Sequence, residues 1–250
     1  MPIAVIDPFA GISGDMTLGA LLSLGVPESW LVELPERLGL GAVMVSIRDA
    51  RRAGVTCKQV EFAIPDEPHG RHVGELIRLV EAAPVSAWTR ERAVRAFRLV
   101  GEAEGRVHDT TPERVHLHEV GAVDAVLDIV GAIEGFERLG VDAIYHWPVA
   151  LGSGWVEAAH GRLPVPAPAT ALLLEGIEVR ANGPVEGEAT TPTGAVLLRV
   201  LSSGAPPAGL RAGAGPSSAP RSGSPSGCPS ASRAAADRRD APAPSRAATP

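Results

Sequence analysis

Carboxylates and glycines alternate in a short stretch near the start of the chain, IDPFAGISGDM at residues 6–16. An apolar run at residues 3–6 precedes it and helical spacing follows at 16–24, so the stretch is predicted to join a strand to a helix. A glycine-rich turn that enters a helix presents backbone N–H groups suited to an anion. The candidate phosphate- or nucleotide-binding residues are therefore Gly11, Ser13 and Gly14.

The two acids of this turn, Asp7 and Asp15, would repel a phosphate by themselves. If they hold a divalent cation such as Mg²⁺, they would attract one instead. The structural alternative is that Ser13 or Asp15 caps the helix while Asp7 hydrogen-bonds within the turn.

A second acidic pattern lies in HLHEVGAVDAVLDIVGAIEG, residues 116–135. On a helical wheel from residue 120 onward, Asp124 and Asp128 share a face with glycines, opposite a broad apolar arc. Glycine destabilises a helix by about 1 kcal/mol relative to alanine, so something must approach this face closely. Because the acids are four residues apart, they could share one cation. The alternative is close packing against another helix, with the acids paired to arginines.

Histidines offer a softer set of metal ligands. His116 and His118 alternate, so an extended segment points both the same way, and with Glu119 they could bind Ni²⁺, Zn²⁺ or Co²⁺. His160 is a further candidate ligand. His69 and His72 lie in a polar loop and are predicted to be solvated, the alternative being transient capture of a metal.

Hydroxyl groups precede a predicted helix in GEATTPTGA, residues 187–195. Thr190, Thr191 and Thr193 are interpreted either as helix caps or as phosphate ligands. The sequence contains no recognisable nucleophilic triad, nucleophile elbow, Walker loop or Cys-x-x-Cys motif, so no catalytic residue is assigned.

The elements that must position these residues follow from periodicity. Alternating apolar residues predict a hairpin from residues 43–52 and 55–64 with its turn near Ala53-Gly54. A helix at 27–38 should break or kink at Pro35. Further helices are expected at 73–82, 86–107, 120–139, 167–175 and 193–202, with strand material at 177–179. The fold class is therefore α/β, with α+β as the alternative: a mixed sheet with packed helices.

Composition limits the function. The chain has 250 residues, 45% hydrophobic, and a net charge of −6. Residues 202–250 carry +4, so the rest carries −10, which argues against nucleic acid as the main partner. Two cysteines cannot form a disulfide framework, and neither a secretory signal nor a membrane-length apolar run is visible. We therefore expect a cytoplasmic protein without a membrane partner.

Two segments differ sharply in composition. Residues 1–201 read as a folded domain, whereas 202–250 are rich in Ala, Pro, Ser, Gly and Arg and are predicted to be disordered. The abrupt change at 202–205 suggests that this tail is read out of the ancestral frame. A genuine disordered tail is the alternative.

Four stretches together resemble the LarC-type nickel insertion proteins of nickel-pincer nucleotide biosynthesis. They are DPFAGISGDMTLGALLSLGV, VHLHEVGAVDAVLDIVGA, LGSGWVEAAHGRLPVPAPAT and GEATTPTGA, in the order and at the separations usual for that family. The resemblance implies insertion of Ni²⁺ into pyridinium-3,5-bisthiocarboxylic acid mononucleotide, yielding the cofactor of lactate racemase. It also implies dependence on CTP with Mg²⁺ or Mn²⁺.

The chain departs from this family in two respects. Its members have a C-terminal domain, similar to the part associated with CTP use and oligomerisation, that is absent here. In some members the two halves are encoded in overlapping reading frames. The expected partners are therefore the missing C-terminal half and, from the family's reaction, the nucleotide substrate; a further copy in a homo-oligomer is also expected. The histidine-rich loop of many members is reduced here to PHGRH. A non-catalytic nickel or nucleotide carrier and a metal-dependent phosphohydrolase remain as alternatives.

Overall fold

The computed structural model describes residues 2–52, 54–65, 71–117, 120, 123–158, 161–180 and 185–209. Helices alternate with short strands through this part of the chain, which confirms the predicted α/β class. The helices are α1 (Gly14–Ser23), α2 (Glu28–Val32), α3 (Leu34–Arg37), α4 (Val73–Ala82), α5 (Ala87–Val107), α6 (Val123–Leu139), α7 (Pro168–Leu173) and α8 (Pro192–Leu201).

The strands are mostly short. They are β1 (Ile3–Ile6), β2 (Met44–Arg52), β3 (Val55–Ala63), β4 (Arg71–His72), β5 (His116–Leu117), β6 (Ala143–His146), β7 (Val149–Ala150), β8 (Gly152–Ser153), β9 (Trp155–Ala158), β10 (Gly161–Pro164), β11 (Val179–Arg180) and β12 (Gly187–Glu188).

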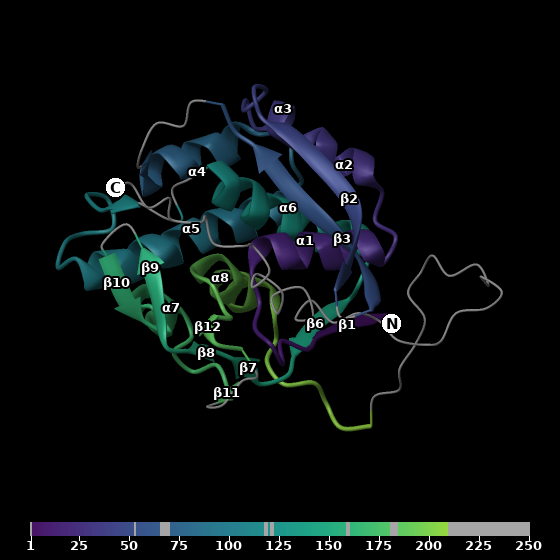
Figure 1. The fold of residues 1–250 in the computed structure, drawn as a ribbon. Coiled ribbons are helices and arrows are strands. Elements are labelled where there is room, and N and C mark those ends of the chain that lie inside the picture. The colour runs from purple at the N-terminus through teal and green to yellow at the C-terminus, as the bar shows by residue number, and fades with distance from the viewer. Residues whose placement is uncertain are drawn as a thin grey trace, which may run out of the picture.

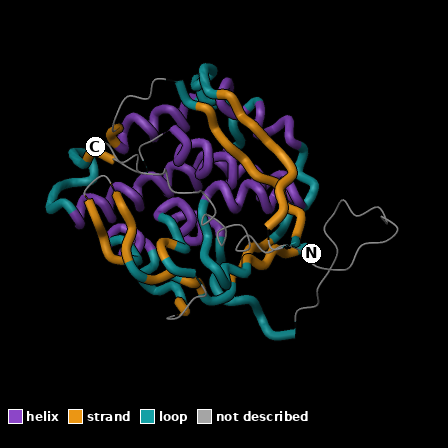
Figure 2. Tube along the Cα trace, in the orientation of Figure 1, coloured by secondary structure: helices purple, strands orange, loops and turns teal. Residues whose placement is uncertain are grey.

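Strand pairing is mixed, as predicted, but the sheet is divided. Within the described ranges the strands form six two-stranded pairs. The pairs β1–β6 and β7–β11 are parallel, whereas β2–β3, β4–β5, β8–β12 and β9–β10 are antiparallel. The β2–β3 and β9–β10 hairpins lie on opposite sides of the helices (Figure 1). The helices thus provide most of the core, and the strands flank it (Figure 2).

Helix α6 is the centre of this core. Helices α1, α5 and α8 pack around it, and most of its residues are buried. Its glycine face is covered by other helices: a Cβ on Gly131 would lie 3.1 Å from Leu18 and Leu34, and one on Gly135 would lie 2.7 Å from Leu21. For these two glycines the close-packing alternative is therefore the correct explanation, because a larger residue would separate α6 from its neighbours.

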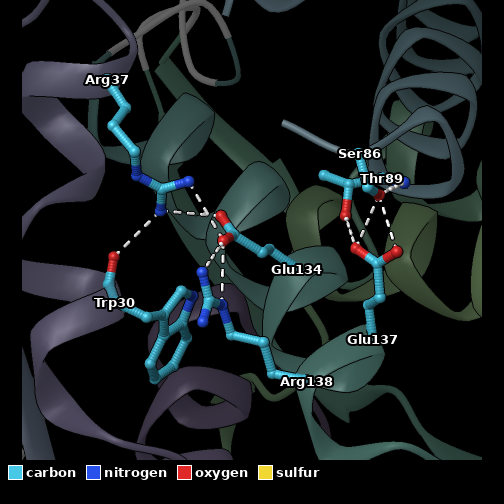
Figure 3. A network of polar contacts seen from close by, with 7 residues as sticks. All are labelled: Trp30, Arg37, Ser86, Thr89, Glu134, Glu137 and Arg138. Carbon is cyan, nitrogen blue, oxygen red and sulfur yellow. Dashed lines mark hydrogen bonds and ion pairs between the residues drawn. The ribbon is translucent and has the colours of Figure 1, made fainter. Parts of the chain in front are cut away.

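A buried ion-pair network fixes α3 against α6 (Figure 3). Both oxygens of Glu134 accept hydrogen bonds from Arg37, at 3.0 and 2.8 Å, and Arg138 adds bonds at 2.9 and 2.7 Å. One turn further along, Glu137 accepts hydrogen bonds from Ser86 and Thr89 of the α5 N-terminus. These acids are engaged in holding helices together.

Most predicted elements are confirmed. The hairpin forms with Ile47 opposite Val60. The helix from 27 to 38 breaks into α2 and α3 at Glu33, two residues before Pro35, which lies in the first turn of α3. Helix α5 begins after its N-cap Ser86, as expected. The described chain beyond α8 still packs on the body, because Ser203 N–H donates to Ile144 O at 2.8 Å. Residues 210–250 of the predicted tail lie outside the described residues.

Candidate functional site

The opening loop leaves the carboxyl end of β1, which pairs in parallel with β6. Ligands of α/β proteins commonly bind beyond this end of parallel strands. The loop ends at Ser13, whose side chain caps α1 by accepting a hydrogen bond from Met16 N–H at 3.4 Å. The Ser13 hydroxyl also donates to the Asp15 carboxylate. The strand–loop–helix arrangement is as predicted, and Ser13 is a helix cap.

Residues 189–191 and the first turn of α8, residues 192–194, lie directly against the opening loop. Ile12 forms an isolated parallel bridge with Thr190, and Thr191 N–H donates to Ile12 O at 3.1 Å. The contact requires glycine on both sides. A Cβ on Gly194 would lie 2.0 Å from Ile12 O, and one on Gly11, which has φ +98°, would lie 2.0 Å from Ala189 O. Two motifs that are 180 residues apart, Gly11 to Thr191, thus form one surface.

The three threonines of residues 189–194 support the local backbone. Thr190 is fully buried and donates to Ala150 O at 2.7 Å. Thr191 caps α8 by accepting from Gly194 N–H at 3.2 Å, and its hydroxyl lies 2.8 Å from that of Thr193. Of the three, Thr191 and Thr193 are only half-buried, so their hydroxyls are the more accessible to a ligand.

Three acids meet where α1 begins beside α6. A Cβ on Gly14 would lie 2.4 Å from Asp128 Cβ, so the first turn of α1 touches the Asp128 side chain. Asp15 backbone N–H donates to the Asp128 carboxylate. Burial, reinforced by repulsion from Asp15 and Asp124, raises the pKa of Asp128 well above its usual range. The acids are therefore close enough to repel one another.

The Asp128 carboxylate has one oxygen in an unusual position. Among the described residues, no group donates a hydrogen bond to Asp128 Oδ1, although this atom is buried. Buried carboxylate oxygens normally have a hydrogen-bond partner or a cation. A divalent cation would supply the missing interaction and reduce the repulsion within the cluster. We define Asp15, Asp124 and Asp128 as the acidic cluster.

Asp7 lies at the opposite end of the same loop, at the carboxyl end of β1. It is half-buried, and its Oδ1 is shielded from solvent. Within the described ranges, no three histidine, cysteine, aspartate or glutamate side chains are arranged to hold a metal ion. Mg²⁺ commonly uses one or two protein carboxylates and completes its shell with water and substrate phosphates. The chemistry of the acidic cluster fits a hard cation bound in this way.

The predicted histidine ligands are only partly described. His118, Glu119 and His160 lie outside the described residues, as does His69. His116 is exposed on β5, directly opposite His72 on β4, and their ring centroids are 4.0 Å apart. His72 is half-buried and its Nδ1 lies 3.2 Å from Val115 O, so the prediction that it is simply solvated is wrong. Only the pairing of β4 with β5 reveals this neighbour, because residues 72 and 116 are far apart in sequence.

Fold and site together define an α/β protein with a carboxylate cluster and two helix N-termini at a single loop junction. The family model described as nickel insertion protein matches residues 4–219, and the chain belongs to this family. A nickel insertion protein of Geotalea daltonii is 44% identical over 206 residues, covering 81% of this chain and 52% of the relative. One from Geobacter sulfurreducens is 45% identical over 207 residues, covering 82% and 53%.

A third relative carries a more specific name. The pyridinium-3,5-bisthiocarboxylic acid mononucleotide nickel insertion protein of a Thermotoga species is 40% identical over 216 residues, covering 80% of this chain and 53% of the relative. The chain thus spans about half the length of these relatives. No solved structure gives a significant match. No helix within the described ranges has the length and apolar character needed to cross a membrane.

Proposed function

We propose that this chain contributes to the insertion of Ni²⁺ into pyridinium-3,5-bisthiocarboxylic acid mononucleotide. Family membership supports nickel insertion, and the Thermotoga relative's name supplies the nucleotide. Nickel is the cargo of this reaction, and the nucleotide is its acceptor. The product would serve lactate racemase and related enzymes.

The observation that carries the proposal is the buried Asp128 oxygen within the acidic cluster. Carboxylate oxygens favour hard cations such as Mg²⁺ and Mn²⁺ over softer metals. We therefore assign Asp124 and Asp128, with Asp15 beside them, to a Mg²⁺ or Mn²⁺ ion that bridges to a phosphate of CTP or of the mononucleotide. Asp7 is the remaining candidate from the same loop. The bound cation would neutralise phosphate charge.

Backbone groups at the same junction would bind the phosphate. Helices α1 and α8 begin on either side of the contact between residues 12 and 191, and each helix N-terminus favours an anion. The close approach at Gly11 and Gly194 brings the backbones of the two segments together. This arrangement answers the apparent conflict between acids and an anion site, because the cation and the helix ends act on different sides of one phosphate.

Two functions at this site must be separated. A chelatase would consume CTP while it loads nickel, whereas a carrier would bind nickel or the nucleotide without consuming CTP. We propose that the other half, or a homo-oligomer that includes it, completes the enzyme in the cytoplasm.

The test combines the full 250-residue chain with nickel chloride, MgCl₂, CTP and the nickel-free mononucleotide, with and without the C-terminal half of the Thermotoga relative. Mass spectrometry measures nickel-loaded product, and chromatography measures CTP consumption. We expect Asp128→Asn to abolish most product formation. Asp49→Asn is the matched control, because Asp49 is an exposed acid on β2 paired with Lys58.

Equal product from Asp128→Asn and Asp49→Asn would refute the assignment of the acidic cluster. Nucleotide binding without CTP consumption, even with the C-terminal half present, would identify a carrier. CTP hydrolysis in the absence of nickel and of the acceptor would instead support a metal-dependent phosphohydrolase.

A further inference from the structure

We propose that His72 and His116 form a nickel-docking site that holds the ion before it is transferred to the acceptor. We call these two residues the imidazole pair. The purpose of this site rests on the proposed function, but nickel binding by the pair can be tested by itself.

The imidazole pair is formed by strand pairing. His72 on β4 is the direct antiparallel partner of His116 on β5, so both side chains leave the same face of the ribbon. Their ring centroids are 4.0 Å apart and the rings are inclined by 48°. Because the rings are tilted, two of their edges lie closer together than the centroids. Imidazole nitrogens bind first-row divalent metals at about 2.1 Å, so two coordinating nitrogens at a right angle about the metal are roughly 3 Å apart.

The hydrogen bond of His72 prepares it for this role. A carbonyl oxygen can only accept, so Nδ1 of His72 must donate its proton to Val115 O, 3.2 Å away. In the tautomer that makes this bond, the lone pair lies on Nε2. Metal-binding histidines almost always donate their other ring N–H to a carboxylate, carbonyl or water in this way. The ring also takes part in the capping box of α4 with Glu75, a contact with which bound nickel would compete. His116 needs only one of its two ring nitrogens, and its exposure leaves it accessible to an ion from solvent.

The composition of the pair explains why it would suit nickel and why it would release it. Imidazole suits nickel, whereas the carboxylates of the acidic cluster suit Mg²⁺ or Mn²⁺. Two protein ligands leave the other coordination positions to water or to the sulfur atoms of the acceptor. A site with few protein ligands gives up its ion readily, which a protein that delivers nickel requires.

The imidazole pair is also near the acidic cluster along the chain. Leu117 ends β5 and Val123 begins α6, and the six intervening peptide links span at most about 22 Å. The pair is therefore no further than about 22 Å along the chain from the start of α6, where we place the phosphate of the acceptor.

The test is a titration of the full chain with Co²⁺ as a spectroscopic probe and with nickel chloride by calorimetry, in the absence of nucleotide. We compare wild type with His72→Asn, His116→Gln and the double variant. Asparagine at residue 72 preserves a good N-cap for α4. His108→Gln removes an imidazole elsewhere, at the end of α5, and is the matched control.

We expect each single variant to weaken nickel binding by at least about tenfold, a loss that even the outer partners of metal-bound histidines produce. The double variant should lose little more, because either ligand alone cannot form the site. The Co²⁺ absorption bands should disappear in all three variants and persist in His108→Gln. Circular dichroism checks that each variant is folded.

Nickel affinity and Co²⁺ spectra unchanged in the folded double variant would overturn the proposal and leave the acidic cluster untouched. Histidine-dependent nickel binding in a chain that supports no insertion would instead contradict the proposed function while supporting the docking site. The two failures are therefore distinguishable.

Discussion

Replacement of Gly14 by alanine should separate α1 from α6 at the acidic cluster. The new Cβ would lie 2.4 Å from Asp128 Cβ and 2.5 Å from both Asp128 Cγ and Oδ2. Ordinary carbon contacts require about 3.5–4.0 Å. Helix α1 or the Asp128 side chain must therefore move by more than 1 Å, roughly the difference between these distances. This movement would disturb the hydrogen bond from Asp15 N–H.

The expected loss of stability follows from two opposing terms. Overpacking of a filled site costs roughly 1–3 kcal/mol. Alanine recovers up to about 1 kcal/mol of helix propensity relative to glycine. Because the new Cβ would meet three atoms at 2.4–2.5 Å, we take the upper part of the overpacking range, about 2–3 kcal/mol. The net destabilisation is then about 1–2 kcal/mol, which for a protein of this size lowers the Tm by roughly 2–8 °C.

Thermal unfolding followed by circular dichroism measures this change in chelator-containing buffer. The control is Gly74→Ala on α4, where a Cβ meets only Arg78 Nη1, at 3.9 Å. That substitution adds helix propensity without a clash, so it should raise the Tm by a few degrees, equivalent to up to about 1 kcal/mol. The same chemical change is thus expected to have opposite signs at two helix positions.

The reasoning would be refuted if Gly14→Ala were as stable as Gly74→Ala, because α1 would then not be held tightly against Asp128. If Gly14→Ala were destabilised but retained full nickel insertion, the inference about cation binding would be wrong, not the inference about packing. The packing would be correct, but the acidic cluster would not bind the cation as we propose.

Other substitutions test the remaining contacts. Because burial raises the pKa of Asp128, its contribution to stability is present below the unfolded pKa and is lost as pH rises through the folded pKa. In chelator-containing buffer, thermal unfolding should therefore show Asp128→Asn gaining stability over wild type as pH increases. Glu134→Ala leaves Arg37 without its carboxylate partner and should cost roughly 3 kcal/mol in denaturant unfolding, against less than about 1 kcal/mol for Glu175→Ala in an exposed pair. Gly194→Ala should destabilise at least as much as Gly14→Ala in the same unfolding assay, because the new Cβ meets backbone atoms of residue 12 that cannot rotate away. A loss of stability smaller than that of Gly14→Ala would contradict the close contact between residues 12 and 194.

Local pattern was sufficient to predict the elements that bear these residues. Ser86 marks the start of α5, the break between α2 and α3 comes two residues before Pro35, and alternating apolar residues form the β2–β3 hairpin. These features depend on interactions between residues close in the chain, such as caps, turns and a single apolar face. For the same reason, the strand before the opening loop and the helix after it were predictable.

Contacts between distant segments were not predictable in the same way. The sequence around the glycines of α6 does not indicate whether a ligand or another helix lies against them. The tertiary structure shows that residues of α1 and α2 pack on this face. His72 could not be recognised as the neighbour of His116, because no periodicity reports the register of two short strands. The mixed sheet we expected forms, within the described residues, as separate two-stranded pairs, and no local pattern indicates which strands pair.

The order of residues thus specified which side chains could bind a cation or an anion, because charge and hydrogen-bonding capacity belong to each side chain alone. Whether Asp15, Asp124 and Asp128 act together depended on how α1 packs against α6. Repulsion and desolvation vary with distance and burial, and the folded chain sets both through contacts between segments more than 100 residues apart, Gly14 to Asp128.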